Sequence, residues 1–96
     1  MSARTEMQPR VLLVEDEAAI AELLKYNLES QNYRVTHAVT GEEAELLLAE
    51  DQFDVILLDW MLPGLSGIEL CRRIRRMDDV RSVPVLMSGA SKAMPK

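Results

Sequence analysis

Acidic residues directly follow two apolar runs of the sequence. Glu15 and Asp16 come after the run Val11–Val14, and Asp59 comes after a longer run that ends at Leu58. Carboxylates that are brought close together repel one another unless a cation neutralises them, and hard oxygen ligands suit Mg²⁺. A carboxylate can also act as a nucleophile and carry a phosphoryl group as an acyl phosphate. If the two runs are neighbouring strands, the three acids predict a magnesium site beside a phosphoryl acceptor.

Each acid also has a simpler interpretation, because Asp and Glu are common at the first position of a helix, where they cap it. Asp16 precedes an amphipathic stretch, and for this residue taken alone the capping role is the favoured one. Asp59 is followed by Trp60–Pro63, which does not have the pattern of a helix start. Asp59 is therefore the stronger candidate for chemistry.

The elements that must position these acids are read from the spacing of apolar residues. Short apolar or alternating runs predict strands; they span residues 11–14, 33–37, 53–58 and 83–87. Apolar residues spaced three and four apart predict helices between the strands; they cover residues 17–30 and begin again at the capping-box patterns Thr40–Glu43 and Ser66–Glu69. This alternation predicts an α/β fold, a doubly wound parallel sheet with helices on both faces and ligands at the carboxyl ends of the strands.

Composition indicates a small globular domain and excludes several other classes of protein. The chain has 96 residues, of which 48% are hydrophobic and 28% charged, as expected for one small globular domain. Its net charge of −5 argues against a nucleic-acid-binding module. The single cysteine, Cys71, excludes an internal disulfide and a cysteine-cluster zinc site. No apolar run is long enough for a membrane span and none resembles a signal peptide, so we expect no membrane association and a cytoplasmic location.

Three segments together resemble a known family. Val11–Glu17, Asp54–Gly67 and Val83–Met87 are similar, in order and spacing, to the receiver domain of bacterial two-component response regulators. Within that family, Leu58–Gly64 is most similar to the winged-helix transcription-factor branch and its phosphate-regulon type. The similarity runs from Arg10 to Met87 and implies a flavodoxin-like receiver fold that acts in phosphorelay signalling as a module and not as an enzyme.

The resemblance also implies roles for single residues. Asp59 is the implied phosphoacceptor, and Asp16 is the implied direct ligand of Mg²⁺. Glu15 would reach the metal through water, and Met61 would offer its backbone carbonyl. The implied partner is a sensor histidine kinase.

The sequence departs from the family pattern after the fourth strand. Counting from Pro84, the family's phosphoryl-binding hydroxyl falls on Gly89, which has none, and Ser88 takes its place only if the strand end shifts by one residue. The family's lysine after a fifth strand is matched by neither Lys92 nor Lys96, so we assign that role to no residue.

These departures lead us to expect an incomplete receiver. Residues 1–9 are expected to be a disordered leader, 10–87 a partial receiver domain with three and a half of the family's five βα units, and 88–96 a tail unlike the family. Without a fifth strand, 83–87 would be an apolar edge open to association. The family's DNA-binding domain is expected to be absent from this fragment, so we expect it not to bind nucleic acid directly. The alternative is a truncated or frame-shifted product without phosphotransfer, at most a partner-binding module.

Two further features receive no chemical role. His37, the only histidine, ends the second predicted strand and has no partner arrangement typical of catalysis. The arginines of the third predicted helix are interpreted as a solvated face in preference to a binding surface; they are Arg72, Arg73, Arg75 and Arg76.

Overall fold

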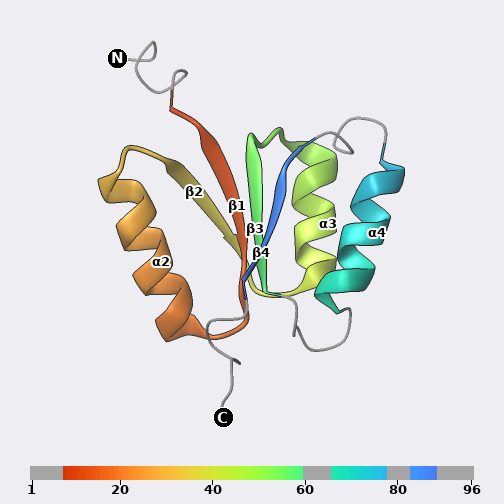
Figure 1. Cartoon of the computed structure of the whole chain (residues 1–96), viewed down its shortest axis with the longest axis horizontal. Coiled ribbons are helices and arrows are strands. Elements are labelled where there is room, and N and C mark those ends of the chain that lie inside the picture. The colour runs from red at the N-terminus through yellow and green to blue at the C-terminus, as the bar shows by residue number, and fades with distance from the viewer. Residues whose placement is uncertain (1–7, 60–65, 78–82, 89–96) are drawn as a thin grey trace.

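A computed structural model of the chain describes residues 8–59, 66–77 and 83–88. Strands and helices alternate along it, as the apolar spacing predicts (Figure 1). In chain order they are β1 (Arg10–Val14), α2 (Ala18–Ser30), β2 (Arg34–Ala38), α3 (Gly41–Glu50), β3 (Val55–Asp59), α4 (Gly67–Arg76) and β4 (Val85–Ser88).

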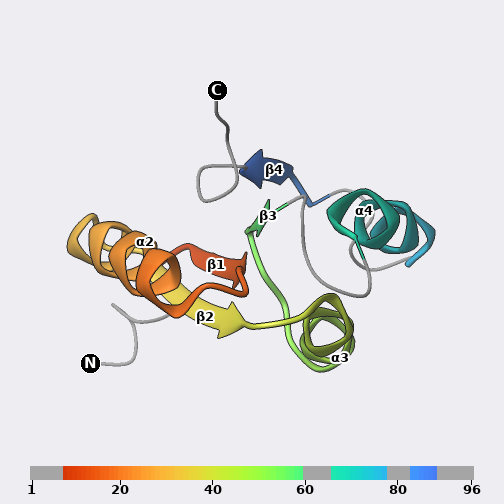
Figure 2. The ribbon, with the colours of Figure 1, turned by 90° about the horizontal axis from the view of Figure 1, so that it is seen from below.

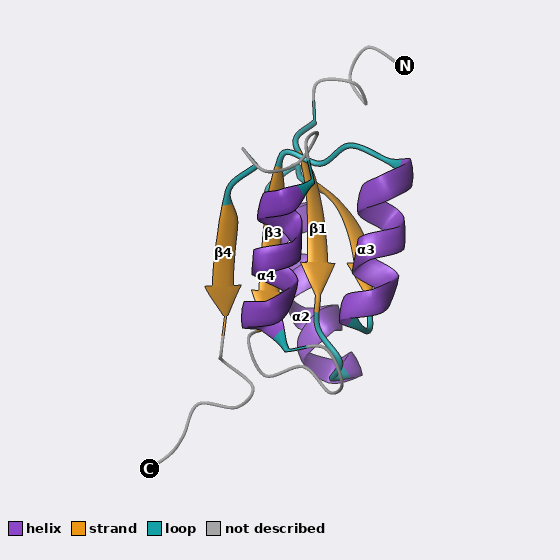
Figure 3. Cartoon of the chain, turned by 90° about the vertical axis from the view of Figure 1, so that its right-hand side faces the viewer, coloured by secondary structure: helices purple, strands orange, loops and turns teal. Residues whose placement is uncertain are grey.

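The strands form one parallel sheet in the order β2-β1-β3-β4. The arrows therefore point the same way, and their carboxyl ends lie along one edge (Figure 3). The central pair is β1 and β3, with Val14 opposite Leu58. This order confirms the premise on which the acidic site depends, namely that the first and third strands are neighbours.

Helices cover both faces of the sheet (Figure 2). On one face, Leu12 and Ile56 pack with residues of α3 and α4, including Leu48 and Leu70. On the other face, Val11 and its neighbours pack against α2. Because β1 and β3 bury side chains on both faces, they appear in the sequence as continuous apolar runs without polar alternation.

Side chains cap the starts of α3 and α4 as predicted, but not the start of α2. Thr40 Oγ1 accepts a hydrogen bond from Glu43 N at 3.1 Å, and Ser66 Oγ accepts one from Glu69 N at 3.1 Å, which confirms both caps. Glu43 reaches back one residue further than in a capping box, to Val39 N at 2.8 Å. The prediction that Asp16 caps α2 is wrong, because Glu17 holds the N-cap position with extended backbone angles and no side-chain cap bond.

The edge strand β4 starts two residues later than predicted and ends at Ser88. Pro84 has no N–H to give to the sheet, although its carbonyl accepts Ile56 N at 2.9 Å. Among the described strands β4 has a neighbour only on its β3 side, and the side chain of Leu86 is 57% exposed. None of the helices in the described residues is both long and apolar enough to cross a lipid bilayer.

Candidate functional site

The acids predicted to meet do meet, at the carboxyl ends of β1 and β3. One carboxylate oxygen from each of Glu15, Asp16 and Asp59 lies within 4.8 Å of the other two. Glu15 is 2% exposed and Asp59 is 1% exposed, whereas Asp16 is half-buried. The cluster is therefore a partly enclosed, oxygen-lined site and not a set of scattered surface acids.

Backbone geometry explains why these side chains converge. Asp59 is the last residue of β3, and Glu15 and Asp16 are the first two residues beyond β1. Parallel neighbouring strands end at the same edge of a sheet, so residues that follow or end them lie close together. Glu15 Oε2 also accepts a hydrogen bond from Glu17 N at 3.2 Å, which holds part of its carboxylate over the start of α2.

The end of β2 contributes further contacts to this site. Glu15 N donates to the carbonyl oxygen of Ala38 at 3.0 Å, and His37 Nε2 lies 2.7 Å from the carbonyl oxygen of Glu15. No role is predicted for His37 from the sequence, and the structure brings it into contact with the acidic segment. The signal was indirect: His37 is a polar residue near the end of β2, the strand that flanks β1.

The donor set fits a hard divalent cation. Two buried carboxylates and a third half-buried one concentrate negative charge, and burying unneutralised charge is costly. Mg²⁺ binds through one or two carboxylates while keeping waters and phosphate oxygens as further ligands. The site thus has the ligand chemistry that Mg²⁺ requires, supplied by the residues that the sequence predicted.

Of the other positions considered for this site in the sequence, only one lies within the described residues. Met61, Gly89, Lys92 and Lys96 lie outside the described residues. Ser88 lies within them, and its Cα is the register partner of the Cα of Asp59.

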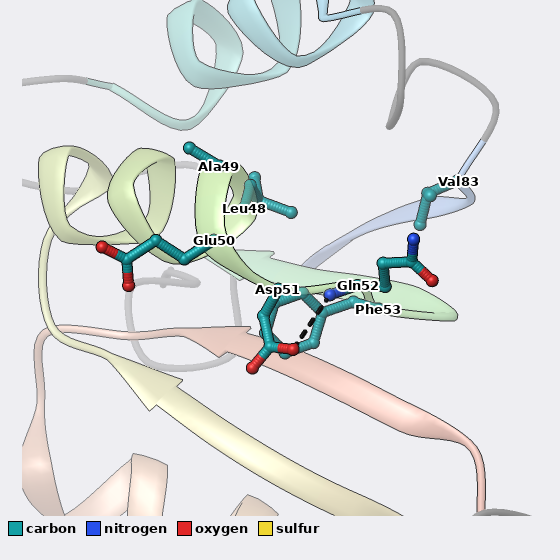
Figure 4. Close-up of a pocket in the computed structure, with 7 residues that line it drawn as sticks. All are labelled: Leu48, Ala49, Glu50, Asp51, Gln52, Phe53 and Val83. Atoms are coloured by element: carbon teal, nitrogen blue, oxygen red, sulfur yellow. Dashed lines mark hydrogen bonds between the residues drawn. The ribbon is translucent and has the colours of Figure 1, made fainter.

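A hollow of about 320 Å³ lies at the end of the sheet opposite to the acidic cluster (Figure 4). Its lining comes from the end of α3, the loop into β3 and Val83. Beside it, Arg10 forms two 2.8 Å hydrogen bonds with Asp51, and its guanidinium lies 5.1 Å from the centre of the Phe53 ring. The hydrogen bonds from Arg10 lower the pKa of Asp51 to about 2. These contacts join the start of β1 to the loop before β3, so this end of the molecule has a structural role.

Known proteins share this sequence pattern and fold. The sequence model of the response regulator receiver domain matches residues 11–96. The phosphate regulon transcriptional regulatory protein PhoB of Rhizobium meliloti is 48% identical over 84 residues, which is 88% of this chain but only 37% of that protein. The chain therefore spans little more than a third of that curated relative.

Solved structures agree with the sequence comparison. The chemotaxis response regulator CheY4 of Vibrio cholerae has a TM-score of 0.82 and 28% identity, covering 90% of this chain and 76% of that one. The receiver domain of the sensor histidine kinase PA1611 of Pseudomonas aeruginosa, with a magnesium ion coordinated in its active-site cleft, has a TM-score of 0.80 and 34% identity. That alignment covers 83% of this chain and 66% of the other. On this sequence match and this fold, the chain belongs to the response regulator receiver domain family.

Proposed function

We propose that this receiver domain accepts a phosphoryl group on Asp59 in a Mg²⁺-dependent reaction, from a phosphohistidine of a partner sensor histidine kinase. One observation carries the proposal: the buried carboxylate of Asp59 lies with those of Glu15 and Asp16 within 4.8 Å at the carboxyl ends of adjacent strands. Membership of the receiver family supports the same assignment. The magnesium ion in the related PA1611 receiver supports the choice of metal.

The transfer itself requires little beyond positioning. A carboxylate oxygen of Asp59 attacks the phosphorus in line with the P–N bond of the phosphohistidine. The new O–P bond forms as the P–N bond breaks, and the leaving imidazole keeps that electron pair and takes a proton from solvent. The product is an acyl phosphate on Asp59, so the domain is modified once and does not turn over a substrate as an enzyme does.

Residues of this chain would hold the metal around that carboxylate. Asp16 and Asp59 are the proposed direct ligands, Glu15 the proposed ligand through water, and Met61 the proposed backbone-carbonyl ligand. When bound, Mg²⁺ supplies positive charge that stabilises the phosphoryl oxygens. Glu15 and Asp59 contribute a rigid, partly enclosed setting because both are buried.

The names of the relatives support a proposal for the wider role. Several of them are named as transcriptional regulators, and this chain covers 33–37% of their lengths. We therefore place the domain in a cytoplasmic phosphorelay that controls transcription, with DNA contacts made outside these 96 residues.

Intact-mass spectrometry tests the proposal. The purified chain is incubated with acetyl phosphate and Mg²⁺, and the expected product carries one added phosphoryl group. The adduct should be absent from Asp59→Asn and after chelation of the metal. It should be retained in Asp54→Asn, an exposed aspartate close by in sequence but at the other end of β3.

Two outcomes would contradict the proposal. One is an adduct that persists in Asp59→Asn, which would place the phosphoryl group elsewhere. The other is no adduct on the wild-type chain at any acetyl phosphate concentration. That second result would favour the alternative of a partner-binding module without phosphotransfer.

A further inference from the structure

The peptide that joins Glu15 to Asp16 connects two of the three clustered acids. Its orientation sets the directions in which both side chains leave the backbone. The last register pair of β1 and β2 is Val14 with Ala38, so this peptide lies just beyond the paired residues. Residues at the end of β2 nevertheless form contacts with this peptide, from the side of β1 that faces away from β3.

Two hydrogen bonds make this connection. Glu15 N donates to the carbonyl oxygen of Ala38 at 3.0 Å. His37 Nε2 lies 2.7 Å from the carbonyl oxygen of Glu15, at the short end of the range for N–H···O bonds. Both backbone polar groups of Glu15 are thus engaged by consecutive residues of β2.

The carbonyl oxygen of Glu15 determines which ring nitrogen of His37 must carry a proton in this contact. A carbonyl oxygen can only accept, so His37 Nε2 must carry the proton and donate. In the neutral imidazole this bond selects the Nε2–H tautomer. The register explains the reach: His37 pairs with Leu13, two residues before Glu15, and its ring extends forward along β1 to the Glu15 carbonyl.

We infer that His37 is a positioning residue for the metal site. Its Nε2–H holds the Glu15–Asp16 peptide in the orientation that presents both carboxylates towards Asp59. This inference rests on the proposed function, because it concerns the same site. Removing hydrogen-bond partners that orient metal ligands typically weakens metal binding about 10- to 100-fold.

Three variants separate the hydrogen bond from the bulk of the ring. His37→Phe keeps an aromatic ring and loses the donor. His37→Gln keeps an N–H donor at similar reach. Thr36→Val is the control, since it removes a polar group at the adjacent position and leaves His37 in place.

Mg²⁺ binding is measured by calorimetric titration of each folded variant. We expect His37→Phe to bind Mg²⁺ about 10-fold more weakly than wild type, with His37→Gln and Thr36→Val close to wild type. The ¹⁵N shifts of the His37 ring in the wild-type chain should show a protonated Nε2, and this signature needs no metal.

Several results would overturn the inference. Equal affinity of His37→Phe and wild type would remove the positioning role, as would an equal loss in His37→Phe and His37→Gln. A ring protonated only at Nδ1 would remove the hydrogen bond itself. In each of these cases wild-type Mg²⁺ binding leaves the proposed function intact, whereas a wild-type chain that binds no Mg²⁺ would overturn both.

Discussion

The Cα atoms of Asp59 and Ser88 are register partners, as the last residues of the adjacent parallel strands β3 and β4. The proposed acceptor therefore lies one strand away from the edge of the described sheet. The register also bears on the family's phosphoryl-binding hydroxyl. Counting from Pro84 gives Gly89 for that position, whereas the backbone residue beside Asp59 is Ser88.

This difference can be tested by moving the hydroxyl. Because the family position falls on Gly89, we expect Ser88→Ala to form the Asp59 adduct at the wild-type rate. Gly89→Thr should accelerate it by about 10-fold to 100-fold, since a hydrogen bond to a charged group contributes about 1.5–3 kcal/mol. The rate is followed by mass spectrometry at fixed acetyl phosphate and Mg²⁺. A clear fall in Ser88→Ala would assign the role to Ser88 instead.

Mg²⁺ should raise the melting temperature of the wild-type chain. At a Mg²⁺ concentration 100 times the dissociation constant, mass action stabilises the fold by about 2.7 kcal/mol. For a domain of this size that corresponds to a shift of about 10 °C or more. The shift, measured by circular dichroism, should be lost in Asp16→Asn and in Asp59→Asn. Equal shifts in wild type and both variants would show that Mg²⁺ acts elsewhere on the protein.

The metal-free forms of these variants provide a second readout. Removing one charge from three carboxylates within 4.8 Å relieves repulsion, so Asp59→Asn should melt at a higher temperature than wild type when Mg²⁺ is absent. A lower melting temperature would mean that hydrogen bonds made by the Asp59 carboxylate outweigh the repulsion.

Core packing under the site should dominate stability. Leu12 is fully buried in β1, and Leu12→Ala should cost about 2–5 kcal/mol because it leaves a cavity beside β3. Leu23 on α2 is 58% exposed, so Leu23→Ala should stay within about 0.5 kcal/mol of wild type. Urea unfolding gives both free energies. Similar costs for the two substitutions would contradict the described packing of β1.

Features of the fold and site could be predicted from the sequence where they depend on residues close together along the chain. Continuous apolar runs predicted the buried strands β1 and β3, and capping residues predicted the starts of α3 and α4, because these signals are local. The convergence of Glu15, Asp16 and Asp59 was predicted from parallel topology. The contact from His37 to Glu15 was missed, since it depends on the register between two strands and spans 22 positions.

The Arg10–Asp51 pair should make stability depend on pH. Hydrogen bonding to Arg10 lowers the pKa of Asp51 from 3.8 to about 2 in the folded chain. A carboxyl with a lowered folded pKa adds stability above its unfolded pKa, and that stability is lost as the pH falls through its folded pKa. Asp51→Asn should therefore melt below wild type at pH 7, and the two curves should converge between about pH 4 and pH 2.

Glu50→Gln provides the control for this pair, because it changes the adjacent exposed carboxylate at the end of α3. Thermal melts across the pH series should keep its difference from wild type small. A gap between wild type and Asp51→Asn that persists at pH 2 would mean that the substitution acts through packing near Phe53 and not through charge.

The open side of β4 should promote self-association. Val85–Ser88 has no charged side chain, and among the described strands it is paired on one side only. Leu86 is 57% exposed there and lines an apolar hollow of about 410 Å³ with Leu28 and Leu57. Unpaired strand edges without charges favour pairing with another chain, and a lysine on the edge opposes it.

Leu86→Lys should therefore reduce association that rises with protein concentration, as measured by light scattering after size-exclusion chromatography. Leu46→Lys is the matched control, because Leu46 is 66% exposed on α3 and the substitution changes net charge equally. If both variants reduced association to the same extent, charge alone would explain the effect. If only Leu86→Lys did so, the edge of β4 would be the contact surface, one strand away from Asp59.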